Sequence, residues 1–322
     1  MSLFRPYQYK SKPDLIPGKG WVKNGFFQFF ELFFRKFWRF ISTNLCYFLV
    51  TLPMLIFVFY LVNGIFADKL EALGEGNILL AGVGFIASFF SFVPSFLNAP
   101  LLIISVLLYG PVTMGLTYMY RNFAREEHAW ASDLWSRAWA NARQGLFFGI
   151  LDILLTYLFI RGIFGNVAEA GRNISYALST ILSVISGLAL VIWLFMRHYT
   201  YLMAVTINLN VLQILKNAWL FVVLGFRRNL ISALVTLCSI VVSFLLAPLI
   251  TVITVPLIFY AFTWFCTVFT CYPIVKKYLI VPALEAEQAK AGENLQASET
   301  EPDTGNTIAA PPLSDDHPNN DQ

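Results

Sequence analysis

Residues 230–275 read LISALVTLCSIVVSFLLAPLITVITVPLIFYAFTWFCTVFTCYPIV, which is 46 positions without one Asp, Glu, Lys or Arg. A helix needs about 20 predominantly apolar residues to cross the hydrocarbon core of a bilayer, so this run is roughly twice the length of one crossing. Pro248 and Pro256 lie near its middle and disfavour a single continuous helix. We therefore predict two membrane-spanning helices, 230–250 and 252–275, joined by a tight turn near Thr251.

Four more stretches are long and apolar enough for a crossing, at 40–66, 98–120, 145–165 and 174–197. Of all 322 residues, 57% are hydrophobic and 13% are charged, whereas a typical soluble domain is about 45–50% apolar and about 25% charged. This composition argues against a soluble globular protein. We predict an all-α fold, a polytopic transmembrane helical bundle of about six spans, within one membrane domain at 26–283.

The apolar stretch at 78–93 has 16 residues and ends before Pro94, which is short for a crossing and typical of a re-entrant or interfacial helix. Lys and Arg residues collect on the cytoplasmic side of membrane proteins. Six spans with a cytoplasmic N-terminus place 19 of these residues inside and three outside, whereas a seventh span at 78–93 places 10 inside and 12 outside. The charges therefore favour six spans with both termini in the cytoplasm.

The two ends of the chain are polar. Residues 1–25 form a polar, basic segment that we expect in the cytoplasm. From Glu285 onward there are nine acidic residues and one Lys, with almost no large apolar residue. Such a segment cannot bury enough surface to offset its ordering entropy, so 284–322 is predicted to be a disordered acidic cytoplasmic tail. The preceding 284 residues carry a net charge of +11, which suits anionic lipid head groups.

Three basic, aromatic stretches precede the first, third and fifth spans. They are FFQFFELFFRKFWRF (26–40), SDLWSRAWANARQG (132–145) and NVLQILKNAWLFVVLGFRRN (210–229). Aromatic residues on one helix face and cations on the other are typical of a helix lying in the membrane interface. The predicted interfacial anchors are Arg35, Lys36, Trp38, Arg39, Trp135, Trp139, Lys216 and Trp219. The stretches serve either as anchors alone or as the starts of three helix–span–span repeats.

Asp152 is the only acidic residue inside a predicted span. Charged groups at membrane depth are costly and usually face a bundle interior or a water path. A functional site would combine Asp152 with Thr156, one helical turn further on, and with Arg197 at the inner end of the fourth span. The alternative is a structural Asp152 that bonds a neighbouring helix or reaches the inner interface.

Gly110 and Pro111 lie within the second span. Proline removes one backbone hydrogen bond of a helix, so we predict a helix kink at this pair. Kinks of this kind line cavities in some transporters and are packing features in other proteins.

Signatures of catalysis are absent from the chain, among them G-x-S-x-G, G-x-x-x-x-G-K-[ST] and H-E-x-x-H. The four cysteines lie in apolar runs without a C-x-x-C pair, and the three histidines are scattered. We therefore expect no enzymatic activity, no cofactor, no metal site and no nucleic-acid partner.

Four segments together resemble the YesL family of bacterial membrane proteins, whose function is unknown. They are NLCYFLVTLP (44–53), YGPVTMGLTYMYRNFAREE (109–127), AWANARQG (138–145) and ILKNAW (214–219). The resemblance covers roughly residues 15–283. The long insertion at about 60–100 departs from shorter members, and the acidic tail lies outside the resemblance.

The resemblance implies a multi-pass protein of the bacterial cell membrane. Members of the family are often encoded beside genes of carbohydrate uptake and breakdown. The resemblance therefore also suggests an accessory or regulatory component of carbohydrate uptake, with a sugar transporter permease as partner. The residues themselves leave an alternative open, a secondary transporter or channel for a small solute with a polar path near Asp152.

Overall fold

The computed structural model describes residues 25–71, 95–169, 175–246, 253–285 and 288. Several predicted segments therefore lie outside the described residues. They are most of the N-terminal segment 1–25, the stretch 78–93, the turn near Thr251 and nearly all of the tail 284–322.

The predicted all-α transmembrane bundle is confirmed. In the described part of the chain, five helices are long and apolar enough to cross a membrane, at Pro100–Ala124, Ala142–Asn166, Tyr176–Thr206, Phe226–Ser243 and Val255–Glu285. The first predicted span, 40–66, lies within a further long helix, α2 (Phe37–Glu71). The remaining long helices are α4 (Ser95–Ala124), α6 (Ala142–Glu169), α7 (Tyr176–Thr206), α9 (Phe226–Ile240) and α11 (Tyr260–Val275). The π-helical segments η1 (Val241–Leu246), η2 (Val255–Phe259) and η3 (Lys276–Ile280) extend the last two.

Three short helices interrupt this series, namely α1 (Gly25–Arg35), α5 (Ala131–Ala140) and α8 (Val211–Leu224). Each is joined to the following long helix by a single residue, which is Lys36, Asn141 or Gly225. Among the helices that the structure describes, the order of one short and two long helices thus occurs three times, as α1–α2–α4, α5–α6–α7 and α8–α9–α11. This order matches the predicted helix–span–span repeat.

Each of the three basic stretches, predicted as a helix, is divided into two helices by a bend at its joining residue. Distant parts of the chain contact two of these bends, at Lys36 and Gly225. The Lys36 ammonium donates a hydrogen bond to the Glu127 carbonyl (2.8 Å). A Cβ at Gly225 would collide with the Tyr199 hydroxyl and the Ile274 side chain, so only glycine fits this bend without a shift of its neighbours.

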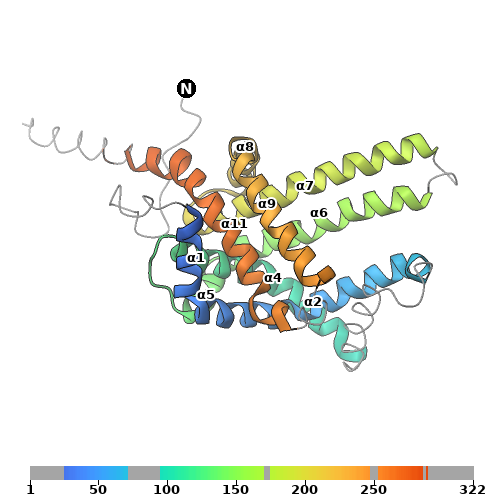
Figure 1. The fold of residues 1–322 in the computed structure, drawn as a ribbon, viewed down its shortest axis with the longest axis horizontal. Helices are drawn as coiled ribbons and strands as arrows, with labels where there is room; N and C mark the ends of the chain where they lie inside the picture. The colour runs from blue at the N-terminus through green and yellow to red at the C-terminus, as the bar shows by residue number, and fades with distance from the viewer. Residues whose placement is uncertain (1–24, 72–94, 170–174, 247–252, 286–287, 289–322) are drawn as a thin grey trace, which may run out of the picture.

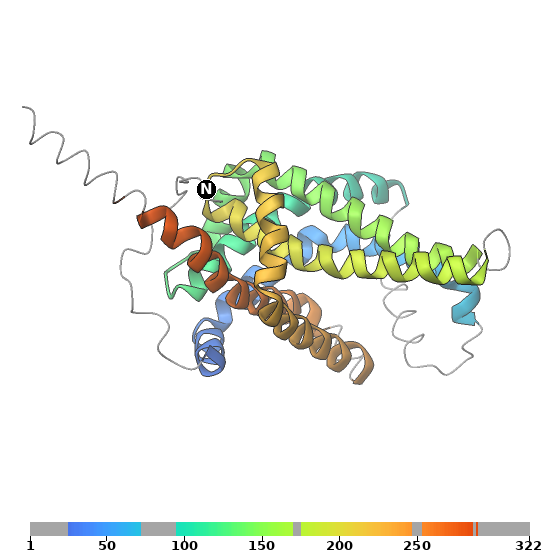
Figure 2. The ribbon, with the colours of Figure 1, turned by 90° about the horizontal axis from the view of Figure 1, so that it is seen from above.

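Helices α4, α7 and α11 pack against one another in the middle of the bundle. Around them, α2 packs against α4 and α11, α6 packs against α4 and α7, and α9 packs against α11. More than half of the apolar windows of α4 and α11 is buried inside the protein, against less than a fifth for α6, α7 and α9. Beyond this core α6 and α7 continue side by side (Figure 1, Figure 2). Their outward surface is apolar, with Leu188 60% exposed, which suits contact with lipid acyl chains.

The aromatic stretch 26–40 divides its side chains between the core and the surface. Phe29, Phe33 and Phe40 are buried, whereas Phe26, Phe34 and Trp38 are exposed. Phe40 is the centre of an aromatic cluster, with ring centroids 4.8 Å from Phe265 and 4.9 Å from Phe33. We call Phe29, Phe33, Phe40, Tyr120, Phe123 and Phe265 the aromatic cluster. It binds α1 and α2 to α4 and α11.

Asn44 joins α2 to the last span. Its side-chain amide donates to the carbonyls of Val255 (2.9 Å) and Pro256 (2.6 Å), and its oxygen accepts the N–H of Ala261 (2.7 Å). Proline and π-helical geometry leave backbone groups of this segment without their usual helical partners. Asn44 supplies those partners from another helix.

Glycines permit the close approach of α4 and α6. A Cβ at Gly110 would overlap the Gly145 carbonyl and the Gly149 Cα, and a Cβ at Gly145 would lie 2.9 Å from the Pro111 Cα. Helix α4 continues through Gly110 and Pro111 to Ala124. This pair therefore provides a helix–helix contact, in the manner of small residues spaced four apart in membrane helices.

We predict that Gly110→Ala lowers the free energy of unfolding by about 1–3 kcal/mol, because the methyl group meets backbone that cannot move aside. Gly187→Ala is the matched control, since its Cβ would meet only the Ile163 side chain at 4.0 Å. Thermal unfolding in detergent measures both. Equal effects of the two substitutions would contradict the close contact.

Lys36 lies in a desolvated position at the first bend. Its ammonium is 4.5 Å from the centroid of the Phe123 ring. Burial, followed by the nearby charges of Arg35 and Arg39, lowers the pKa of Lys36 to about 8. A lowered pKa means that the folded protein loses this proton at a pH where a solvated lysine keeps its proton.

We expect Lys36 to acquire a nucleophilic neutral amine as the pH rises through about 8. Pulsed acylation at a series of pH values, read by mass spectrometry of the peptides, measures its half-maximal reactivity. The exposed Lys216 provides the internal reference. If Lys36 in the folded protein becomes reactive only at the pH at which it reacts in the unfolded protein, the desolvation of Lys36 is refuted.

Candidate functional site

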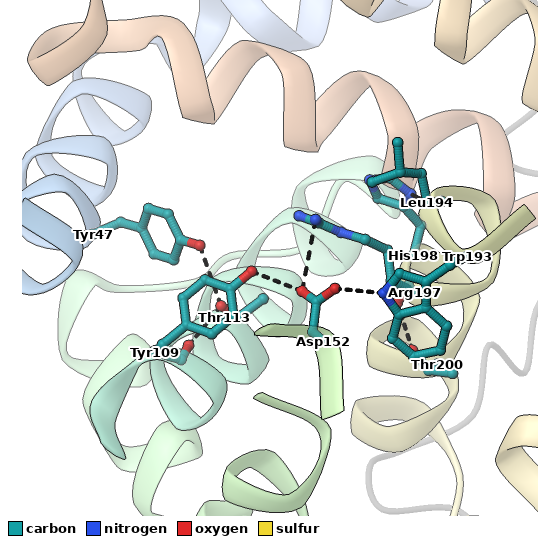
Figure 3. A network of polar contacts seen from close by, with 9 residues as sticks. All are labelled: Tyr47, Tyr109, Thr113, Asp152, Trp193, Leu194, Arg197, His198 and Thr200. Carbon is teal, nitrogen blue, oxygen red and sulfur yellow. Dashed lines mark hydrogen bonds and ion pairs between the residues drawn. The ribbon is translucent and has the colours of Figure 1, made fainter. Parts of the chain in front are cut away.

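Asp152 lies where α4, α6 and α7 meet, and its side chain is 2% exposed. The Tyr109 hydroxyl donates to Oδ2 (2.8 Å) and the Trp193 indole N–H donates to Oδ1 (2.9 Å). The Arg197 guanidinium lies on the same carboxylate, with Nη1 3.6 Å from Oδ2. Figure 3 shows the guanidinium reaching from α7 over Asp152. The structure therefore brings together two of the three predicted site residues.

The pair lies deep within the bundle. Asp152 is ten residues after the start of α6 and Arg197 is nine residues before the end of α7, which places each about 14–15 Å from its helix end. Helix α7 continues past the predicted end of the fourth span at Arg197 to Thr206. Each charge is about half the thickness of a bilayer core from that end of its own helix.

Two neutral donors satisfy the Asp152 carboxylate, whereas Arg197 is less well satisfied. A charge-assisted N–H···O bond normally measures about 2.7–2.9 Å, so the 3.6 Å separation from Asp152 is a loose ion pair. The guanidinium carbon also lies 5.3 Å from the centroid of the Trp264 ring. The Arg197 Nε is buried and has no hydrogen-bond partner among the described residues. Arg197 therefore retains donor capacity.

Arg197 borders a cavity of about 170 Å³ between α2, α4, α7 and α11. The lining is largely aromatic and comprises Tyr47, Thr51, Met54, Tyr109, Leu116, Arg197, Tyr260 and Trp264. Hydrogen bonds fix two of the lining side chains. The Trp264 indole N–H donates to the Thr117 hydroxyl (2.9 Å), and the hydroxyls of Tyr47 and Thr113 share a hydrogen bond (3.3 Å). In Figure 3 the Tyr47 hydroxyl points inward from the side opposite Arg197.

A concave apolar wall with one charged group and a few hydroxyls is typical of a small-molecule site. Within the described ranges, no three His, Cys, Asp or Glu side chains are placed to hold a metal ion. The arrangement is therefore suited to binding a small solute by aromatic contact and by the guanidinium.

A second buried arginine has a structural role. Arg121, at the end of α4, donates to the Val205 carbonyl (3.1 Å) and to the Thr206 hydroxyl (3.3 Å). These groups lie at the C-terminus of α7, where the helix dipole favours a cation. The guanidinium groups of Arg121 and Arg137 each lie 4.7 Å from the Tyr118 ring. Together they join the ends of α4, α5 and α7.

The other predicted residues occupy varied positions. The Thr156 hydroxyl is buried and has no hydrogen-bond partner in the part of the chain that the structure describes, and Thr156 does not line the cavity. Arg35 pairs with Glu126 (3.3 Å) and Arg39 donates to the Ala129 carbonyl (3.0 Å), so both predicted anchors also bind the protein itself. The anchors Trp38, Trp135, Trp139, Lys216 and Trp219 are exposed.

The sequence did not identify the aromatic partners of the charged pair, Tyr109, Trp193 and Trp264, nor the cavity residue Tyr47. The signal available was a Tyr or Trp inside a span, since its polar tip requires a partner there. The G-x-x-x-G spacing of Gly145 and Gly149 was a second signal, which marks close helix contacts in membranes.

Comparison with family models, curated proteins and solved structures finds no match for this chain. The likeness to the YesL family therefore stays a prediction from the quoted segments.

We predict that Asp152→Leu lowers the free energy of unfolding by about 3 kcal/mol, because Arg197 is left as an unpaired charge. Adding Arg197→Met should restore most of this loss. The control is Glu31→Gln in the exposed Glu31–Arg35 pair (3.8 Å), which should change stability by less than about 0.5 kcal/mol. Chemical denaturation in detergent measures the four proteins. A double variant as unstable as Asp152→Leu would show that the pair is not coupled.

Proposed function

We propose that this membrane protein binds a small solute in the cavity beside Arg197 and carries it across the bilayer as a secondary transporter. The observation that supports this proposal most is the position of the cavity. It lies among α2, α4, α7 and α11, bordered by a charged group that is about 14 Å from its helix end. A purely structural bundle has no need of a cavity next to its most costly charges.

Transport requires that the cavity be closed on one side, and we infer that the aromatic cluster closes it. The aromatic cluster lies between the cavity and the bends that follow α1, α5 and α8: Phe40 precedes Tyr47 on α2, and Tyr120 follows Leu116 on α4. In this conformation the cluster separates the solute site from that end of the bundle. Alternating access would require the cluster to open, and the repeated short–long–long units supply elements that can move relative to one another.

We place the protein in a bacterial cell membrane, with the bends and both termini on the cytoplasmic side and anionic lipids around them. The support is the excess of Lys and Arg in the segments that precede the odd-numbered spans.

The alternative is an accessory or regulatory protein of carbohydrate uptake without chemistry of its own, bound to a sugar transporter permease. The resemblance to the YesL family suggests it. The densely packed aromatic cluster favours it, because stacked rings such as Phe29 and Phe265 (5.2 Å) form a rigid end to the bundle.

Chemical labelling separates the two functions. In a background without Cys46, Cys238, Cys266 and Cys271, we expect Thr51→Cys to react with a small, charged methanethiosulfonate reagent, because Thr51 lines the cavity. The reaction should occur in intact cells and not in inside-out vesicles, since the aromatic cluster closes the other side. Mass spectrometry of the purified protein measures the product.

Val268→Cys is the control, because this side chain is buried in the same bundle and does not line the cavity. It should stay unmodified from both sides. If Thr51→Cys is as inert as Val268→Cys, the bundle is solid and the accessory function is favoured over transport.

A further inference from the structure

We propose that the cavity takes a small organic monocarboxylate, bound through the guanidinium of Arg197. This inference rests on the proposed function, since it names the class of solute that the same cavity would bind. Three features of the cavity carry it: the charge on its wall, the free donor capacity of that charge, and the shape and chemistry of the rest of the lining.

The charge favours an anion over a cation. Arg197 is the only charged residue among those lining the cavity. Asp152 is 2% exposed and does not line it, because Tyr109 and Trp193 cover its two oxygens. A cationic solute would meet the guanidinium and would not reach the carboxylate. An anionic solute would meet the guanidinium directly.

The donors of Arg197 suit a carboxylate. The guanidinium presents several N–H groups in a planar fork that matches the two oxygens of a carboxylate. One Nη atom makes a loose contact with Asp152, and Nε has no partner among the described residues. Nε itself is buried, whereas the Arg197 side chain as a whole is 20% exposed. A bound carboxylate would contact this exposed part of the guanidinium at the ordinary length of a charge-assisted bond. The Asp152 carboxylate would keep its two neutral donors and stay solvated by them.

The remainder of the lining limits the body of the solute. Apolar cavities of about 150 Å³ in proteins admit benzene, and this cavity measures about 170 Å³. Tyr47 and Tyr260 meet edge to face at 5.7 Å between ring centroids, and Trp264 adds a third aromatic wall. The space therefore suits one ring, or an aliphatic chain of similar volume, attached to one carboxylate.

Equilibrium binding of radiolabelled benzoate to the purified full-length chain in detergent tests the inference. We expect saturable binding that unlabelled benzoate displaces. Benzamide, which has the same shape without the charge, should bind roughly tenfold or more weakly, because a hydrogen bond to a charged group contributes that factor. Benzylamine, which is cationic at neutral pH, should not compete.

The variants Arg197→Gln and Asp152→Asn/Arg197→Gln remove the guanidinium, and the second leaves no unpaired charge, so that it is expected to fold. Both should lose at least tenfold in benzoate affinity. The control Arg161→Gln removes an exposed guanidinium of α6 outside the cavity lining and should bind as the unmodified protein does.

Four outcomes overturn the inference. Equal affinity for benzoate and benzamide, or unchanged affinity in a folded Asp152→Asn/Arg197→Gln variant, would show that Arg197 does not bind the anion. A cavity that Thr51→Cys labelling finds open but that binds no benzoate would leave the proposed function in place with a different solute class. A cavity that is neither labelled nor occupied would refute both proposals.

Discussion

The interior of a bilayer offers no water to polar groups, so each of them needs a partner within its own helix or on a neighbouring one. The described structure meets this constraint by pairing across the bundle. Asn44 completes the backbone of the π-helical segment at Val255 and Pro256. Ser232 and Thr267 share a hydrogen bond (2.8 Å) that joins α9 to α11. These pairs decide which helices are neighbours, because apolar contacts alone discriminate little between partners in lipid.

Arg197 meets the same constraint less completely. Its partner Asp152 takes short hydrogen bonds from Tyr109 and Trp193, which leaves the ion pair longer and one guanidinium nitrogen without a partner. An incompletely satisfied charge next to a cavity is costly. The proteins that keep such a charge commonly use it for a ligand. This link between energetic cost and location is the physical basis of the proposed solute site.

The end of the bundle near the bends and the middle of the bundle differ in how densely they are packed. Near the bends, aromatic rings and the buried Arg121 join α1, α4, α7 and α11 into a dense region. At the level of Asp152, α2, α4, α7 and α11 border the cavity. The dense end therefore supplies rigidity, and the middle of the bundle supplies the space that a ligand requires.

The sequence alone determined the all-α membrane architecture, the positions of the long helices and the selection of Asp152 as an unusual residue. Hydrophobic length and charge are properties of single segments, and the bilayer acts on each segment separately. The bends at Lys36, Asn141 and Gly225, the depth of Arg197 and the aromatic partners of Asp152 were decided by the tertiary structure. Each depends on contacts between residues far apart in the chain. The approach of Gly110 to Gly145 and Gly149 depends on both helices at once. The glycine spacing of one segment could therefore suggest a close helix contact but could not identify the partner helix.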